Sequence, residues 1–145
     1  MSDMKLLSDQ DRNTLLSMSI PSVTMDVEKG QIKRFAEAIG DFNPLWMGES
    51  GGGVIAPPTF LRMMITELPA LPELASFPQM LDVGSDWTYV MAVKPGDAIT
   101  AVTRFVSVNQ RNIAIGAAVI LVLETKYTNQ HGQDVANQRN TLIRY

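Results

Sequence analysis

The sequence predicts an α+β domain in which a buried helix packs against an antiparallel β-sheet, and two observations lead to this class. From residue 79 onward the chain is a series of runs rich in β-branched and aromatic residues, separated by short polar turns, which is typical of successive antiparallel strands. Residues 59–68, in the first half, are apolar enough to form a buried helix. One buried helix against such a sheet is an α+β layer arrangement.

Size and composition exclude several kinds of protein. The chain has 145 residues, of which 46% are hydrophobic and 19% charged, as expected for one folded domain rather than a disordered chain. A net charge of −3 without a cluster of Lys or Arg argues against nucleic acid as a partner, and the absence of Cys excludes disulfides and thiolate chemistry. No apolar segment of signal-peptide or membrane-spanning length is present, so we expect a cytoplasmic protein without membrane association.

The first half begins with two predicted helices and a strand. Ser8 opens a capping-box pattern that predicts a short helix to about residue 18, and alternation of apolar and polar residues predicts a strand at 22–26. We therefore expect residues 1–20 to be a helical extension and 21–145 a single domain. A second helix is predicted because four apolar residues recur at helical spacing and Gly40 follows the last of them. These four residues are Ile32, Phe35, Ala36 and Ile39.

Prolines and polar turns divide the rest of the chain. The predicted helix 59–68 follows Pro57-Pro58, and three further prolines mark residues 69–78 as a loop. The run 119–123 is uninterrupted and apolar, which places it in the centre of the sheet. The predicted strands are 79–93, 98–108, 113–127 and 134–145, joined by turns at 94–97, 109–112 and 129–132.

Two segments, GDFNPL at 40–45 and GVIAPPTF at 53–60, resemble the MaoC-like dehydratase family, and the resemblance extends over about residues 21–145. It implies a hot-dog fold, in which the helix 59–68 is wrapped by an antiparallel sheet of five or six strands. It also implies a substrate, namely a 3-hydroxyacyl or enoyl thioester of coenzyme A or acyl carrier protein. No cofactor is implied.

The same resemblance identifies what is missing from the catalytic machinery. The family uses an Asp and a His of the first segment for proton transfer, and a backbone N–H at the start of the hot-dog helix for the enolate oxygen. Asp41 and Asn43 match the motif, but Trp46 stands where the family has its His, and an indole cannot exchange a proton near neutral pH. Pro58 stands at the position of the N–H donor and has none.

The residues that the resemblance implies for substrate binding each have a structural alternative. Trp46 can line the site or belong to the core, and the glycines at 51–53 can approach a pantetheine arm or serve as a connector. Asp41 and Asn43 equally fit a turn in which both side chains cap the local backbone. The implied binding residues are Trp46, Gly53, Val54, Ile55, Ala56, Pro58, Thr59 and Trp87.

Other candidate residues are few. His131, the only histidine, lies in an expected hairpin turn, where it is either a solvated turn residue or a substitute base acting across a subunit interface. No dinucleotide, P-loop, metal-ligand or nucleophile-elbow motif is present, so we expect no metal and no cofactor. Four methionines fit either an acyl tunnel or ordinary core packing. These are Met63, Met64, Met80 and Met91.

Three functions fit these observations. The chain can be a catalytically degenerate subunit that binds an acyl thioester while a partner hot-dog chain supplies the Asp and His. It can be a self-sufficient homodimeric hydratase or thioesterase that uses Asp41, or a non-catalytic acyl-coenzyme A-binding module. Trp46 favours the first and third. Because a single hot dog leaves a sheet edge exposed, we expect a homodimer or heterodimer joined edge to edge.

Overall fold

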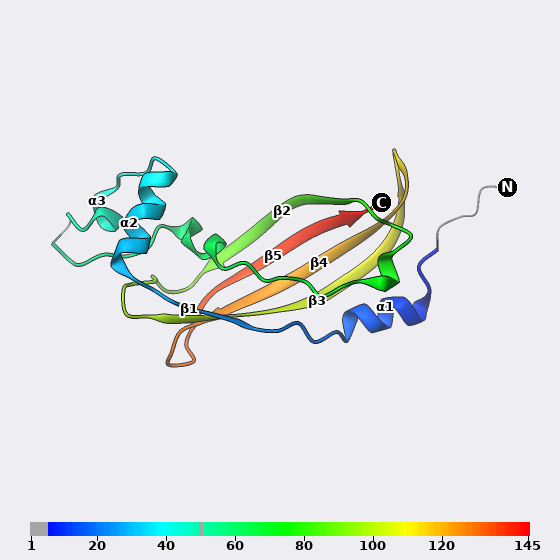
Figure 1. The fold of residues 1–145 in the computed structure, drawn as a ribbon, viewed down its shortest axis with the longest axis horizontal. Helices are drawn as coiled ribbons and strands as arrows, with labels where there is room; N and C mark the ends of the chain where they lie inside the picture. The colour runs from blue at the N-terminus through cyan, green and yellow to red at the C-terminus, as the bar shows by residue number, and fades with distance from the viewer. Residues whose placement is uncertain (1–5, 50) are drawn as a thin grey trace.

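The computed structural model describes residues 6–49 and 51–145 and contains a five-stranded, antiparallel sheet. Residues 1–5 lie outside the described part. They begin the N-terminal region in which we expected no targeting segment. The strand order is β1-β3-β4-β5-β2, and Figure 1 shows β2 to β5 running together along the length of the molecule. The strands are β1 (Val23–Asp26), β2 (Met80–Tyr89), β3 (Ala98–Ile113), β4 (Gly116–Thr128) and β5 (Asp134–Arg144).

The predicted sheet is confirmed, together with the central place of residues 119–123. These residues lie in β4, the third of the five strands in the sheet order. Alternate residues of β3, β4 and β5 are buried and define the inner face of the sheet. The outer face carries charge instead, since Glu124 Oε1 lies 3.0 Å from Arg104 Nη2 and Glu124 Oε2 lies 3.7 Å from Arg139 Nε.

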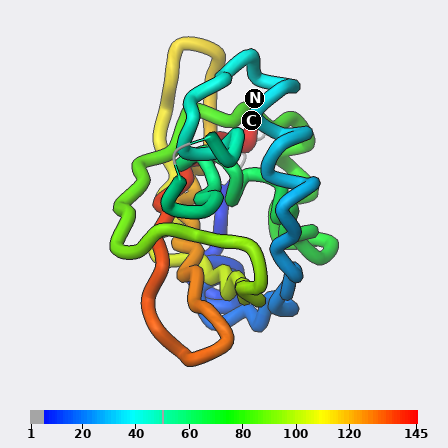
Figure 2. The backbone as a smooth tube through the Cα atoms, turned by 90° about the vertical axis from the view of Figure 1, so that its left-hand side faces the viewer, coloured from blue at the N-terminus to red at the C-terminus, as the bar shows by residue number. Residues whose placement is uncertain are grey.

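The helices lie toward the two ends of the sheet. They are α1 (Asp9–Leu16), α2 (Lys29–Ala38) and α3 (Pro44–Met47). Ser8 caps α1, because its Oγ accepts a hydrogen bond from the backbone N–H of Asp11 at 3.0 Å, and Gly40 follows α2 in the left-handed region, with φ 69°. Figures 1 and 2 show α2 and α3 together at one end of the molecule, the end that faces the viewer in Figure 2. None of the described helices has the length and apolar character needed to cross a membrane.

The predicted helix 59–68 is wrong in length and type. The segment begins with a short 3₁₀ helix, η1 (Pro58–Met63), and then turns extended at Met64, with φ −82° and ψ 96°. We call residues 64–71 the covering loop; η2 (Pro72–Leu74), a second 3₁₀ turn, follows it. A ten-residue helix is marginal without an apolar surface to pack on. The inner face opposite the covering loop is only partly apolar, since Thr103, Thr125 and Gln138 interrupt its leucines.

The predicted turn at 109–112 is also wrong. β3 continues through these residues to Ile113, and the chain reverses at Ala114 and Ile115, as the pairing of Ile113 with Gly116 requires. The polar residues that suggested a turn lie near the end of a long strand, where polar side chains reach solvent or bond to neighbours. The Oε1 atom of Gln110, for example, accepts a hydrogen bond from the backbone N–H of Leu7 at 2.7 Å.

The core is divided into two apolar clusters. The first joins α2, η1 and one end of the sheet, and includes Ile32 and Phe60, both fully buried. The rings of Phe35 and Phe60 meet edge to face with centroids 5.7 Å apart. The second cluster joins α1, η2 and the other end of the sheet, and includes Leu15 and Leu74. The covering loop crosses the inner face between these two clusters.

Candidate functional site

The motif residues Asp41 and Asn43 lie together in the turn between α2 and α3, where both side chains bond the local backbone. The Oδ1 atom of Asp41 accepts from the backbone N–H of Asn43 at 3.2 Å, and the Oδ1 atom of Asn43 accepts from the N–H of Leu45 at 3.0 Å. Asn43 is therefore the N-cap of α3, whose first residue is Pro44. The turn itself accounts for the positions of both side chains.

Trp46, at the position of the family's His, lines a small cavity of about 260 Å³. Its indole Nε1 is buried and has no hydrogen-bond partner among the described residues. The cavity lies between α3, η1 and the residues that follow β2. Four of the predicted binding residues line it, namely Trp46, Ile55, Ala56 and Pro58.

The other predicted binding residues lie elsewhere. Gly53 and Thr59 are exposed, and Val54 is buried in the first apolar cluster. Trp87 lies on β2, where its ring stacks on Tyr89 with centroids 5.7 Å apart and on Tyr127 with centroids 5.5 Å apart. These four residues are not among those lining the small cavity.

The start of η1 lacks a backbone donor where the resemblance places the oxyanion contact. Pro57 is the N-cap and Pro58 the first residue of η1, and neither carries an N–H. The N–H of Phe60 is used within the turn, since it donates to the carbonyl oxygen of Pro57 at 2.9 Å. This arrangement offers a developing enolate no hydrogen bond from Pro58 or Phe60.

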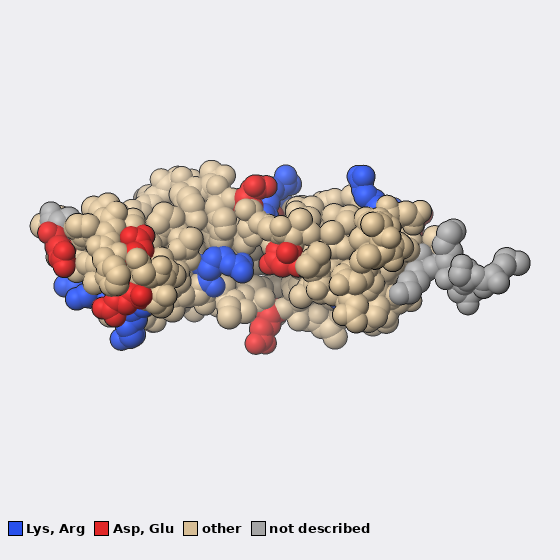
Figure 3. Space-filling model, turned by 90° about the horizontal axis from the view of Figure 1, so that it is seen from above, with Lys and Arg blue, Asp and Glu red and all other residues tan. Residues whose placement is uncertain are grey.

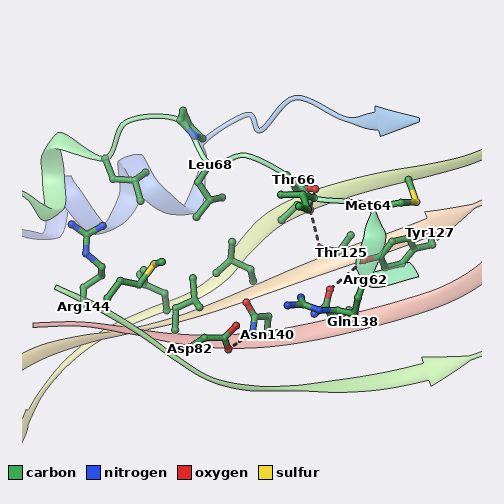
Figure 4. A pocket seen from close by; sticks show the side chains of 18 residues that line it. Arg62, Met64, Thr66, Leu68, Asp82, Thr125, Tyr127, Gln138, Asn140 and Arg144 are labelled. Atoms are coloured by element: carbon green, nitrogen blue, oxygen red, sulfur yellow. Dashed lines mark hydrogen bonds between the residues drawn. The ribbon is translucent and has the colours of Figure 1, made fainter. Parts of the chain in front are cut away.

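A larger cavity of about 540 Å³ lies between the covering loop and the inner face of the sheet. Leu121, Leu123 and Leu142 give it an apolar side. Figure 4 shows Gln138 and Asn140 on the sheet side of this cavity, with Thr66 on the covering loop across from them. The cavity occupies the position where the predicted helix would have packed on the sheet.

The methionines divide between the two cavities. Met64 and Met80 line the large cavity and Met91 lines the small one, whereas Met63 is exposed and lines neither. η1 lies between the cavities, because Phe60 faces the small one and Arg62 the large one. Three of the four methionines therefore line cavities, rather than all of them packing only in the core.

The large cavity has polar side chains in its floor. Thr103, Thr125 and Gln138 are each less than a tenth exposed, and all three line it. The hydroxyl oxygens of Thr103 and Thr125 lie 2.8 Å apart. None of these three residues was predicted from the sequence. The available signal was Thr103 itself, which interrupts the apolar positions that alternate along β3 from Ile99 to Phe105.

Tyr127 orients the amide of Gln138. Its hydroxyl donates to Oε1 of Gln138 at 3.2 Å, and Nε2 of Gln138 donates to Oγ of Ser85 at 2.8 Å. Burial raises the pKa of Tyr127 to about 12, against a smaller lowering effect of the Arg62 charge. The phenol is therefore neutral, and a hydrogen-bond donor, throughout the physiological range.

His131 is exposed in the β4–β5 hairpin, where its backbone N–H donates to Oδ1 of Asn129 at 2.9 Å. Figures 1 and 2 both show this hairpin, in orange, projecting below the end formed by α2 and α3. The fold therefore does not bring His131 to Asp41 within one chain. Among the described residues, no group of three or more His, Asp or Glu side chains is placed to hold a metal ion.

The β2 edge of the sheet is open and carries several exposed apolar residues. β2 is the last strand in the sheet order and nearly all of its residues are exposed. Figure 3 views the molecule from the β2 side and shows charged residues over α2 and α3 and across the middle of the molecule, with uncharged surface between and beyond them. The exposed apolar residues of this edge and the segment that follows it are Met80, Leu81, Val83, Tyr89, Val90 and Met91.

The sheet, the short helix on its inner face and the cavities beside that helix are those of a hot-dog domain. A family model described as FAS1-like, dehydratase domain region, matches residues 15–138. The chain therefore belongs to this dehydratase family, within the MaoC-like hot-dog proteins. No curated protein matches the sequence.

Several solved structures share the fold. The ChsH1–ChsH2 complex from Mycobacterium tuberculosis matches with a TM-score of 0.73 and 18% identity, over 94% of this chain and 87% of that chain. The C-terminally truncated HadBC (3R-hydroxyacyl-ACP dehydratase) complex from the same organism matches with a TM-score of 0.68 and 22% identity, over 95% and 99%. The R-hydratase PhaJ1 from Pseudomonas aeruginosa matches with a TM-score of 0.63 and 16% identity, over 92% and 84%.

Proposed function

We propose that this chain is the non-catalytic, acyl-binding subunit of a hot-dog dehydratase or hydratase, and that it works beside a partner hot-dog chain. The large cavity is the observation that carries the proposal. Its volume of about 540 Å³ falls in the range of pockets that enclose most of a drug-sized ligand. An acyl chain fits this space, because Leu121, Leu123 and Leu142 offer it an apolar wall on the sheet.

The described residues that line the small cavity do not include the Asp and His of the family motif, which supports a binding role. Dehydration of a 3-hydroxyacyl thioester needs a base for the α-proton, an acid for the leaving hydroxyl and donors for the enolate oxygen. Asp41 is a carboxylate without a second proton carrier beside it. Trp46 offers only an N–H donor, and Pro58 offers none. The partner chain would supply the Asp and His of the family motif.

The small cavity is the proposed place for the thioester end of the substrate. It adjoins η1 on the side opposite the large cavity, and it is lined by Trp46, Ile55, Ala56 and Pro58. In this arrangement, the acyl chain lies in the large cavity and the arm of coenzyme A or acyl carrier protein leaves past Trp46. Asp41 and Asn43 remain as a structural turn.

The partner would dock along β2. Exposed strand edges are normally paired or covered, and this one carries exposed apolar residues at both of its ends. The ChsH1–ChsH2 and HadBC structures are complexes of two different chains, which makes a heteromer the favoured arrangement over a homodimer. A cytoplasmic location stays a prediction.

Isolation of the native protein with its partner tests the proposal. Affinity purification at native expression level should recover a second hot-dog chain with an intact Asp and His motif. Hydration of crotonyl-coenzyme A should require that chain and should be insensitive to Asp41→Asn in this one. Trp46→His alone should restore little activity to the isolated chain, because Pro58 still provides no donor. Recovery of only a homodimer that binds acyl-coenzyme A without turnover would favour the binding-module alternative.

A further inference from the structure

A row of polar side chains crosses the floor of the large cavity. Thr103 of β3 pairs directly with Thr125 of β4, and Thr125 pairs with Gln138 of β5. These residues are 6%, 8% and 5% exposed. Side chains that are direct cross-strand neighbours on one face have Cβ atoms about 4.5–5.5 Å apart. The three polar groups therefore form one continuous patch, which we call the polar row.

The rows beside it on the inner face are mainly apolar. Two residues along each strand toward α2 lie Ala101, Tyr127 and Ala136, and two residues the other way lie Phe105, Leu123 and the half-buried Asn140. The apolar residues of these two rows belong to different core clusters, so the polar row separates the two clusters. An apolar core needs no such row, and buried polar groups cost stability unless their hydrogen bonds are made.

The hydrogen bonds made by the polar row leave some of its capacity unused. Thr103 donates to Oγ1 of Thr66 at 3.4 Å, so the 2.8 Å contact requires Thr125 to donate to Thr103. The hydroxyl proton of Thr66 and the lone pairs of Thr125 then have no partner among the described residues. Nε2 of Gln138 donates one hydrogen to Ser85, and its second hydrogen also has no partner there.

These unused groups are of the kind that bonds an oxygen-bearing substituent of a ligand. Thr66 on the covering loop and Gln138 on the sheet each have a hydrogen to donate, and Thr125 can accept one. Figure 4 shows Thr66, Thr125 and Gln138 around the same part of the cavity. The neutral Tyr127 hydroxyl fixes the amide of Gln138 with its nitrogen away from Tyr127. An unsubstituted alkyl chain at this place would leave all of these groups unpaired.

We propose that the acyl group accepted by this cavity carries a hydroxyl or oxo substituent remote from the thioester, and that the polar row binds this oxygen. The inference rests on the proposed acyl-binding function and specifies its substrate class. A site built to bond a substrate oxygen discriminates against the analogue that lacks it, because its own buried groups are then unsatisfied.

Equilibrium binding to the purified full-length chain tests the inference. Decanoyl-coenzyme A is compared by calorimetry with hydroxydecanoyl-coenzyme A thioesters whose hydroxyl is moved stepwise from mid-chain to the terminal carbon. One position of the hydroxyl should bind about tenfold to a hundredfold more tightly than decanoyl-coenzyme A. Neighbouring positions should lose this gain.

Two variants and a matched control assign the gain to the polar row. Thr125→Val and Gln138→Met should each abolish the preference, while the affinity for decanoyl-coenzyme A stays the same or rises. Thr100→Val is the control, because it breaks a similar cross-strand threonine pair, with Thr24 at 2.9 Å, outside the cavity. It should keep the full preference. Thermal unfolding checks that each variant is folded, and the two test variants provide independent readings.

Two outcomes would overturn the inference, and they have different meanings. If all hydroxylated thioesters bind no better than decanoyl-coenzyme A, the acyl-binding function stands and the polar row is only a structural element. If no thioester binds at all, the proposed function itself fails, and the inference fails with it. A preference that survives both Thr125→Val and Gln138→Met would also overturn the assignment to these residues.

Discussion

The motif turn, formed by Asp41 and Asn43, and the large cavity differ in the bonds of their polar residues. In the motif turn, both side chains accept hydrogen bonds from backbone groups two residues away. In the large cavity, Thr103, Thr125 and Gln138 join segments far apart in the sequence. The motif turn is thus held by its own local hydrogen bonds. The floor of the large cavity is instead held by hydrogen bonds between different segments of the chain. This difference fits the proposed function, in which this chain binds the acyl group and a partner chain supplies the catalytic residues.

The largest effect is expected from truncation of the buried aromatic ring of η1. Phe60 is fully buried in η1 and meets Phe35 edge to face. Phe60→Ala should lower the free energy of unfolding by about 3–5 kcal/mol, since truncation of a buried aromatic leaves a void in the core. Met63→Ala, in the same short helix but at an exposed position, is the control and should change it by less than about 0.5 kcal/mol. Similar urea midpoints for the two variants would show that η1 does not anchor the core.

A smaller effect, dependent on pH, is expected for the tyrosine at the cavity floor. The pKa of Tyr127 is about 12 in the folded chain, above its ordinary value of 10.0, chiefly because the phenol is buried. The folded state therefore retains a proton that the unfolded chain loses. Its stabilising contribution is fully present below pH 10 and is lost as the pH rises through about 12.

Comparison with Tyr127→Phe isolates this contribution. The variant also loses the hydrogen bond to Gln138, which should cost about 1 kcal/mol at neutral pH. Between pH 10 and pH 12, wild type should lose about 2 kcal/mol more than the variant in urea unfolding. Parallel pH profiles for the two proteins would contradict the burial of this hydroxyl.

The smallest effects are expected in the motif turn. Asn43→Ala removes the N-cap of α3 and should cost about 1 kcal/mol. Asp41→Asn keeps an oxygen that can accept from the N–H of residue 43, so it should change stability by less than about 0.5 kcal/mol. Both can be measured by thermal unfolding. A large loss of stability in Asp41→Asn would mean that the carboxylate charge has a role beyond the turn.

Local patterns in the sequence predicted most of the fold. The helical spacing of Ile32 and Ala36 predicted α2, and the apolar run 119–123 predicted the central strand. These predictions succeed because each element buries its own apolar residues against a neighbour that is apolar too. The motif turn was also predicted, since Asp, Asn and Pro favour one local backbone geometry.

The helix and the polar row could not be predicted in the same way. Residues 59–68 have apolar residues at helical spacing, but whether a short helix forms depends on the surface opposite it. That surface is built from β3, β4 and β5, which are distant in the sequence, and it presents Thr103, Thr125 and Gln138. Thr103 interrupts the apolar positions of its own strand, but that alone does not indicate which residues lie beside it. Only the strand register brings them into one row beneath the covering loop.

Hydration of crotonyl-coenzyme A by the isolated chain tests the central claim most directly. The missing donor at Pro58 and the missing proton carrier at Trp46 affect different parts of the transition state, and each loss typically costs at least about a hundredfold in rate. The account predicts that the wild-type chain, freed of any partner, hydrates the thioester no faster than its Asp41→Asn variant. Rapid hydration by the isolated wild-type chain, abolished by Asp41→Asn, would contradict it and identify this protein as an enzyme with a rearranged site.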